Sequence, residues 1–140
     1  MSAAMFAALF FTVALLVTTA YFLMGSLPLL VLKHDTPLDA RFVRGFFNLY
    51  YVTAFATATA TAISFVCAGR PGIATGAAAL ATIAVVLRKK IIPKMDALGT
   101  QIQSNYVEAI PGFRRMHITA ILINLAQLVA IVWTLISLSK

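Results

Sequence analysis

The sequence predicts an all-α integral membrane protein, a four-helix transmembrane bundle that forms a single domain over residues 1–140. The first observation is composition: 61% of the residues are hydrophobic and 11% are charged, whereas soluble domains average about 45–50% and about 25%. The second is that the apolar residues form four runs, each near the ~20 residues that a spanning helix needs. The third is that basic residues gather at the ends of these runs. The spans are predicted at residues 3–27, 44–68, 72–92 and 114–138.

The first apolar run begins at Ala3 and ends near Gly25 and Pro28. No Lys or Arg precedes Lys33, so the run lacks the basic region of a signal peptide and is expected to be a retained first span. Residues 28–32 stay apolar and are expected at the membrane interface.

The second helix is predicted to begin near Pro37, before its span. Thr36 suits the N-cap, Pro37 suits the first helical position, and Asp39 places negative charge in the first turn, where the helix dipole favours it. Only AGRPG separates this helix from the third, which makes the two antiparallel neighbours. The basic residues 88–90 at the end of the third span are expected to reach the lipid headgroups.

The connection between the third and fourth spans, residues 93–113, is the longest in the chain. Apolar side chains recur in it at three- and four-residue spacing, a pattern typical of an amphipathic helix. We therefore predict a short amphipathic helix that lies at the membrane interface or against the bundle. Its apolar positions are Met95, Leu98, Ile102, Tyr106 and Ile110.

The distribution of basic residues predicts the orientation. Cytoplasmic loops of membrane proteins carry an excess of Lys and Arg, so both termini are expected outside and the two larger loops in the cytoplasm, across a bacterial inner membrane. The same distribution accounts for the net charge of +7 without nucleic acid as a partner. Trp133 and Lys140 are expected to anchor the outer end. The cytoplasmic side holds Lys33, Arg41, Arg44, Arg88, Lys89, Lys90, Lys94, Arg114 and Arg115, and the other side holds Arg70 and Lys140.

Small and hydroxylated residues follow faces of the second and third helices. Hydroxyls in a membrane helix either bond a carbonyl of their own helix or line a polar path between helices, and the pattern leaves both interpretations open. Small residues at four-residue spacing predict close helix packing. The hydroxyl face comprises Tyr50, Thr53, Thr57, Thr61 and Ser64; the small residues are Ala54, Ala58, Ala62, Gly72 and Gly76.

Four polar side chains in the predicted spans are candidates for a shared site. His117, Asn124 and Gln127 fall within a narrow arc of the fourth helix, and Asn48 lies near the same end of the second. They form either a structural hydrogen-bond network or a binding or catalytic site. The catalytic candidates are His117, Asn48 and Asn124; the ligand-binding candidates are Gln127, Tyr51 and Arg115.

The sequence predicts no metal site and no resident cofactor. Haem through His117 or His34 is a further alternative, and the two residues form the one possible bis-histidine pair in the chain, although the LKHDT segment around His34 is predicted to be a solvated loop. Cys67 is predicted to be a small buried hydrophobe. No acidic residue falls inside a span, which argues against an ion-coupled transporter and against a carboxylate-bridged di-iron bundle.

The segments DARFVRGFFN (39–48), IIPKMDALG (91–99) and FRRMHITAILIN (113–124) resemble the anthrone-oxygenase-like family of small four-helix membrane proteins, most of unknown function. The resemblance implies cofactor-free oxygenation of an activated aromatic substrate, with His117 as the base and Asn48 or Asn124 stabilising an oxyanion. The chain is also similar to a second uncharacterised four-helix family, related to a eukaryotic transmembrane protein linked to drug tolerance. That similarity lies at Phe113, His117 and Asn124.

The leading functional hypothesis is a non-catalytic membrane protein, an accessory or assembly subunit of a larger complex or a homo-oligomer. Spans built mainly of Ala, Leu, Ile and Phe suit lateral packing. The alternative is an oxygenase-like or lipophilic-ligand-binding membrane enzyme that uses His117, with haem or quinone binding as a further alternative.

Overall fold

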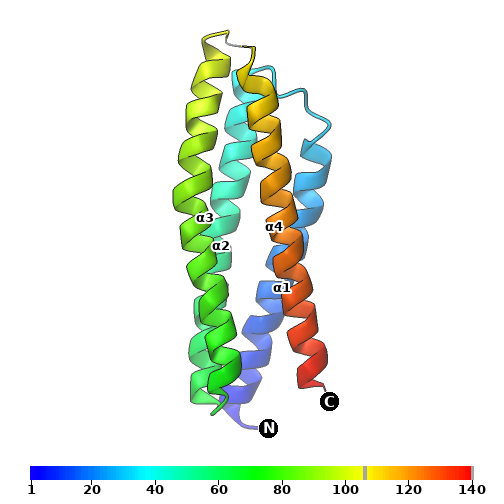
Figure 1. The fold of residues 1–140 in the computed structure, drawn as a ribbon. Coiled ribbons are helices and arrows are strands. Elements are labelled where there is room, and N and C mark those ends of the chain that lie inside the picture. Colours follow the sequence, from blue (N-terminus) through cyan, green and yellow to red (C-terminus); the bar gives the residue numbers. More distant parts are fainter. Residues whose placement is uncertain (106, 140) are drawn as a thin grey trace.

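The computed structural model describes residues 1–105 and 107–139. Over these residues the chain forms four helices and no strand: α1 (Ala3–Leu29), α2 (Pro37–Cys67), α3 (Pro71–Gln103) and α4 (Ala109–Leu138). They run alternately up and down in one elongated bundle (Figure 1). Each helix is long and apolar enough to cross a membrane. The predicted fold class, a four-helix transmembrane bundle, is confirmed.

The bundle has two ends, which differ in what they carry. The loop end holds the α1–α2 and α3–α4 connections, and the terminal end holds both termini and the tight α2–α3 turn (Figure 1). Gly69 in that turn has a φ of 71°, a conformation that glycine adopts without steric cost. The predicted antiparallel pairing of α2 with α3 is confirmed, and α2 packs most extensively against α3 and α1.

The predicted start of α2 is confirmed, and so is the interpretation of its threonine hydroxyls as self-satisfied. Thr36 caps the helix, since its Oγ1 accepts a hydrogen bond from the Asp39 N–H at 3.2 Å, and Pro37 follows in the first turn. Thr57 and Thr61 donate to the carbonyls four residues earlier, both at 2.8 Å. These hydroxyls are satisfied within α2, so they need no partner on another helix.

The segment after Pro93 is helical, but it continues α3 to Gln103 instead of forming the separate interfacial helix that we expected. Its apolar spacing reflects packing on the bundle, where Met95 and Ile102 are buried. An ion pair fixes the segment to α2: Arg44 donates to both carboxylate oxygens of Asp96, at 2.8 and 3.1 Å. These contacts keep the helix continuous through a proline. Tyr106, which belonged to the same predicted face, lies outside the described residues.

Two expectations about small residues are corrected by their positions in the bundle. Cys67 is exposed on the outside of the bundle and is not a buried hydrophobe. Gly72 and Gly76 do not mediate a close helix approach, because no atom of another described helix comes within 4 Å of the position that a Cβ would take. Alanines fill that role instead: Ala54 and Ala58 of α2 and Ala74, Ala77, Ala81 and Ala84 of α3 are buried.

The core is thick at the loop end and thin at the terminal end. At the loop end, aromatic rings of α1, α2 and α4 pack together, with Phe22 and Phe46 centroids 4.8 Å apart and Phe47 and Phe113 fully buried. Toward the terminal end the buried residues form two small clusters in which alanine is prominent. Small side chains cannot fill the space between helices that diverge, so a cavity remains at the terminal end.

Candidate functional site

The two histidines form a hydrogen-bonded pair at the loop end. His34 lies in the α1–α2 connection and His117 near the start of α4, and both side chains are fully buried. Nε2 of His34 is 3.1 Å from Nδ1 of His117, and Nε2 of His117 is 3.2 Å from the Ser26 carbonyl oxygen. The prediction of a solvated loop around His34 was therefore wrong for that residue. Its φ of 59° is uncommon for a residue other than glycine, and its ring packs against Phe113 with centroids 5.6 Å apart.

The bonding partners assign the tautomers of the pair. A carbonyl oxygen only accepts, so Nε2 of His117 carries the proton and Nδ1 of the neutral ring is an acceptor. Nε2 of His34 must then donate to it, which leaves Nδ1 of His34 as an acceptor. That atom is buried without a hydrogen-bond partner among the described residues.

This arrangement caps the C-terminus of α1. The Leu30 N–H, which would ordinarily bond the Ser26 carbonyl, bonds the Leu27 carbonyl instead. His117 supplies the missing donor to Ser26, and Arg114 donates from Nη2 to the Leu30 carbonyl at 3.0 Å. The cationic Arg114 also lies where the dipole of α1 favours positive charge. His117 and Arg114 therefore join α4 to the end of α1.

The surroundings of His34 favour its neutral form. Burial lowers its pKa below the usual 6.5, and the nearby Arg114 guanidinium lowers it further. Asp39, the Leu32 backbone and Asp35 act in the opposite direction and raise the pKa, but each is weaker than burial. A neutral His34 with its proton on Nε2 is consistent with the tautomer assignment.

The polar side chains of α2 and α4 that were candidates for a shared site do not bond to one another as a single cluster among the described residues. Asn48 accepts a hydrogen bond from Arg88 Nε at 2.9 Å, and Gln127 accepts one from the Tyr50 hydroxyl at 2.7 Å. Arg115 is exposed on the outside of α4. The reason is architectural: α2 packs mainly on α1 and α3, so only long side chains such as Tyr50 reach α4. The predicted network between α2 and α4 is thus reduced to one hydrogen bond among the described residues.

Asn124 and Tyr51 lie inside the bundle with polar atoms that the described residues leave unpaired. Asn124 is 1% exposed and Tyr51 2% exposed. Neither polar side-chain atom of Asn124, nor the Tyr51 hydroxyl, has a partner among the described residues. Buried polar groups are ordinarily bonded to protein or ordered water. Neither residue lines the main cavity of the bundle.

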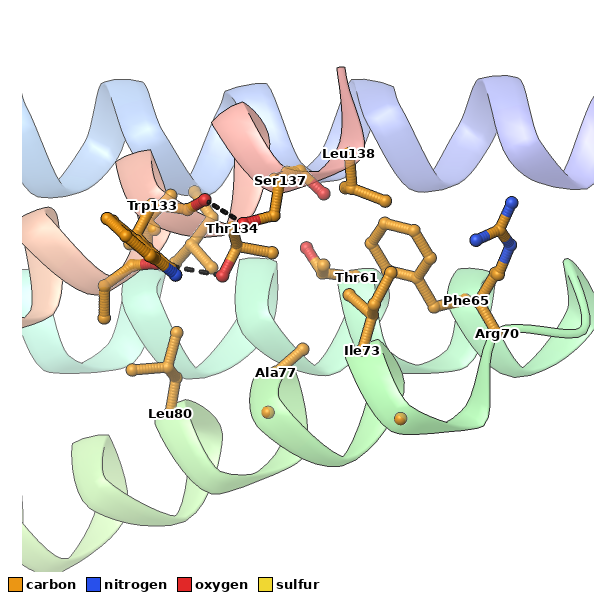
Figure 2. Close-up of a pocket in the computed structure, with 16 residues that line it drawn as sticks. Thr61, Phe65, Arg70, Ile73, Ala77, Leu80, Trp133, Thr134, Ser137 and Leu138 are labelled. Carbon is orange, nitrogen blue, oxygen red and sulfur yellow. Dashed lines mark hydrogen bonds between the residues drawn. The ribbon is translucent and has the colours of Figure 1, made fainter. Parts of the chain in front are cut away.

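That cavity lies at the terminal end, between α3 and α4, and has a volume of about 460 Å³ (Figure 2). Arg70 lies at one end of it, and Leu80 and Trp133 lie at the other. Its wall combines apolar side chains with small residues of α3 and hydroxyls. They include Leu15, Phe65, Leu80, Ile131 and Leu138, then Gly72, Gly76 and Ala77, then Thr12, Thr61, Thr134 and Ser137.

The hydroxyls of the cavity wall use their protons within their own helices. Thr12 donates to the Ala8 carbonyl at 2.7 Å, and Thr61 donates to the Thr57 carbonyl at 2.8 Å. Thr134 and Ser137 do the same in α4, both at 2.9 Å. Arg70 is the one charged side chain among the described residues that line the cavity. The cavity is therefore apolar along its length and cationic at one end.

None of the candidate site residues from the sequence lines this cavity. Four lining residues appear in the sequence analysis in other roles: Thr61 in the hydroxyl face, Gly72 and Gly76 as a packing motif, and Trp133 as an anchor. Trp133 is 72% exposed and lies at the Leu80 end of the cavity (Figure 2), while Lys140, the second expected anchor, lies outside the described residues. The signal that could have indicated the site is Arg70, a cation isolated from the other basic side chains.

No family model, curated protein or solved structure matches the chain. The resemblance to the anthrone-oxygenase-like family therefore stays a prediction. Among the described residues, no three His, Cys, Asp or Glu side chains are grouped so that they could hold a metal ion. The two histidines as they stand do not fit a haem held between their rings, because 3.1 Å between the facing nitrogens leaves no room for an iron and its porphyrin.

Proposed function

We propose that this chain is a non-catalytic, multi-pass membrane protein that binds the hydrocarbon part of a lipophilic ligand in the cavity between α3 and α4. The cavity carries this proposal. Its volume of about 460 Å³ falls within the roughly 300–1,000 Å³ typical of small-molecule sites. We place the loop end in the cytoplasm of a bacterial inner membrane, following the excess of basic residues there.

The chemistry of the cavity favours binding over catalysis. No His, Cys, Asp or Glu is among the described residues that line it. His117, the candidate base of the oxygenase hypothesis, is fully buried at the other end of the bundle, and both of its ring nitrogens are engaged. A substrate in the cavity could not reach that ring. An enzyme built on His117 would need a second space that these contacts do not provide.

The test uses Trp133, the one tryptophan of the chain, which lines the cavity. Lipid with brominated acyl chains quenches tryptophan on contact. In nanodiscs with increasing brominated lipid, we expect a saturable quenching component at low mole fraction, above the gradual quenching by surrounding lipid. Gly76→Leu places a side chain in the cavity and should remove the saturable component.

Gly45→Leu is the matched control. Gly45 is also an exposed helical glycine with no atom of another described helix within 4 Å of its Cβ position, and it lies near the loop end, away from the cavity. Both substitutions favour the helix by roughly 1 kcal/mol, so neither should unfold the bundle. Equal quenching curves for the wild type and both variants would contradict ligand binding in this cavity.

A second candidate function keeps the same cavity but fills it with a helix of another membrane subunit or of a second copy. The small wall made by Gly72, Gly76 and Ala77 favours it, since small residues let helix backbones approach closely. Gentle purification followed by mass spectrometry of all bound protein and lipid distinguishes the two. A protein partner lost in Gly76→Leu and kept in Gly45→Leu would favour the accessory-subunit function over lipid binding.

A further inference from the structure

The charge of the chain is distributed so that one end of the cavity is cationic and unopposed by acidic side chains. Arg70 precedes α3 and lines the cavity. The four acidic residues all belong to the loop end: Asp35 and Asp39 near the start of α2, Asp96 in the last turns of α3, and Glu108 before α4. Asp96 there pairs with Arg44. Any anionic partner of Arg70 must therefore come from outside these side chains.

The length of the cavity matches one leaflet of a bilayer. It extends from Arg70 to Leu80 along α3 (Figure 2), and ten helical residues rise about 15 Å. The hydrocarbon core of a bilayer is about 30 Å thick, so this is the depth of a single leaflet. Between the two ends the wall offers carbon atoms and hydroxyls that already donate within their helices.

The proposal combines these two observations and rests on the proposed function. We propose that the cavity selects an anionic phospholipid from the surrounding membrane, with its phosphate at Arg70 and one acyl chain along Leu80 and Ile131. A guanidinium matches phosphate geometry and can bond two of its oxygens at once. The side chain of the N-cap residue, Arg70, makes no capping hydrogen bond in the described structure, so the N-terminal peptide groups of α3 add to the positive potential around Arg70.

The experiment compares two brominated lipids with identical acyl chains, phosphatidylglycerol and phosphatidylcholine, in the Trp133 quenching assay. The wild type should reach half-saturation at a mole fraction about fivefold lower for phosphatidylglycerol, the factor expected from one basic side chain near an anionic headgroup. Arg70→Gln should make the two curves coincide, chiefly by moving the phosphatidylglycerol curve to a higher mole fraction. Arg70→Lys should keep most of the preference.

Arg115→Gln is the matched control, because it removes one exposed cation from the loop end and leaves the cavity intact. It should keep the fivefold preference. Saturable quenching that is equal for both lipids and insensitive to Arg70→Gln would overturn the anionic selectivity and leave the proposed function standing. If the wild type shows no saturable quenching with either lipid, the result would instead contradict the proposed function. A brominated fatty acid that reaches half-saturation of the quenching at a lower mole fraction than brominated phosphatidylglycerol would overturn the assignment to a phospholipid.

Discussion

His117 contacts three separate parts of the chain through one ring. Its Nε2 donates to the Ser26 carbonyl of α1, its Nδ1 accepts from His34 in the α1–α2 connection, and its edge packs on Phe47 of α2 at 5.4 Å between centroids. A catalytic base needs a free lone pair that faces a substrate. The lone pair of His117 faces His34, so the residue acts as a structural link between helices.

His117→Ala should therefore destabilise the bundle. The variant leaves a void and two buried groups without partners, the Ser26 carbonyl and the Nε2–H of His34, at an expected total of about 3 kcal/mol. Reversible unfolding in mixed micelles measures this loss. Ile118→Ala is the control, since Ile118 is 41% exposed on the outside of α4, and it should cost less than ~1 kcal/mol. A fully stable His117→Ala protein that has lost a catalytic activity would instead support the oxygenase hypothesis.

At the scale of single residues, local contacts could be predicted from the sequence, whereas long-range partners could not. The Thr36 cap and the Thr57 and Thr61 hydrogen bonds follow from residues three or four apart, so spacing is sufficient to identify them. The partner of His117 is 83 positions away and sits in a left-handed backbone conformation. Nothing in LKHDT distinguishes that conformation from an ordinary exposed turn.

At the scale of elements, the α1–α2 connection is folded into the bundle by His34. Its neutral ring is what allows it to be buried, because an imidazolium there would face the Arg114 guanidinium with little solvent. The connection should therefore respond to pH more than an exposed loop would. The titrating group behind this pH response is His34, which lies between α1 and α2.

Stability should fall as the pH drops below about 6.5. The pKa of His34 is lower in the folded state than its ordinary 6.5. As the pH falls, the unfolded chain therefore binds the proton first, and this binding stabilises the unfolded state relative to the folded state. Stability is then flat above about pH 7.5 and declines by at most ~1.4 kcal/mol per pH unit for this one group. Unfolding midpoints measured between pH 8 and pH 5 should show the decline.

His34→Asn is the matching variant, since Asn tolerates the left-handed backbone and does not titrate in this range. Its pH dependence should be shallower than that of the wild type. An equal slope in the two proteins would show that other groups cause the decline.

The elements also show where hydrophobic patterns stop being informative. Residues 93–103 carry an apolar face that suits either a separate surface helix or a continuation of α3. Pro93 favoured the first, and packing of Met95 and Ile102 on α2 and α4, together with the Arg44–Asp96 ion pair, decides for the second. Periodicity identifies a helical face, but it does not say which surface covers it.

At the scale of the whole molecule, the two ends of the bundle differ in charge and in packing. The loop end carries nine of the eleven basic residues and the aromatic part of the core. The terminal end carries Arg70, a thin core and the cavity. Composition and hydropathy were sufficient to predict four spanning helices. The cavity could not be predicted in this way, because it arises from how far α3 and α4 diverge.

The native Cys67, the one cysteine of the chain, offers a direct test of orientation. It is exposed at the terminal end of α2. With the loop end in the cytoplasm, a membrane-impermeant maleimide should label Cys67 in intact spheroplasts. A Cys67→Ser, Ser104→Cys protein places the thiol at the loop end and should be labelled only after permeabilisation. The reverse pattern would contradict the proposed topology.

The attachment of α4 at the loop end has a mechanical consequence. Phe113, Arg114 and His117 hold the first turns of α4 against α1 and its connection, whereas near its other end α4 borders the cavity. We therefore expect α4 to swing about its first turns, with its other end moving sideways into the membrane. A lipid could enter or leave by that swing while the aromatic core stays packed, so exchange need not disturb the part of the molecule that keeps it folded.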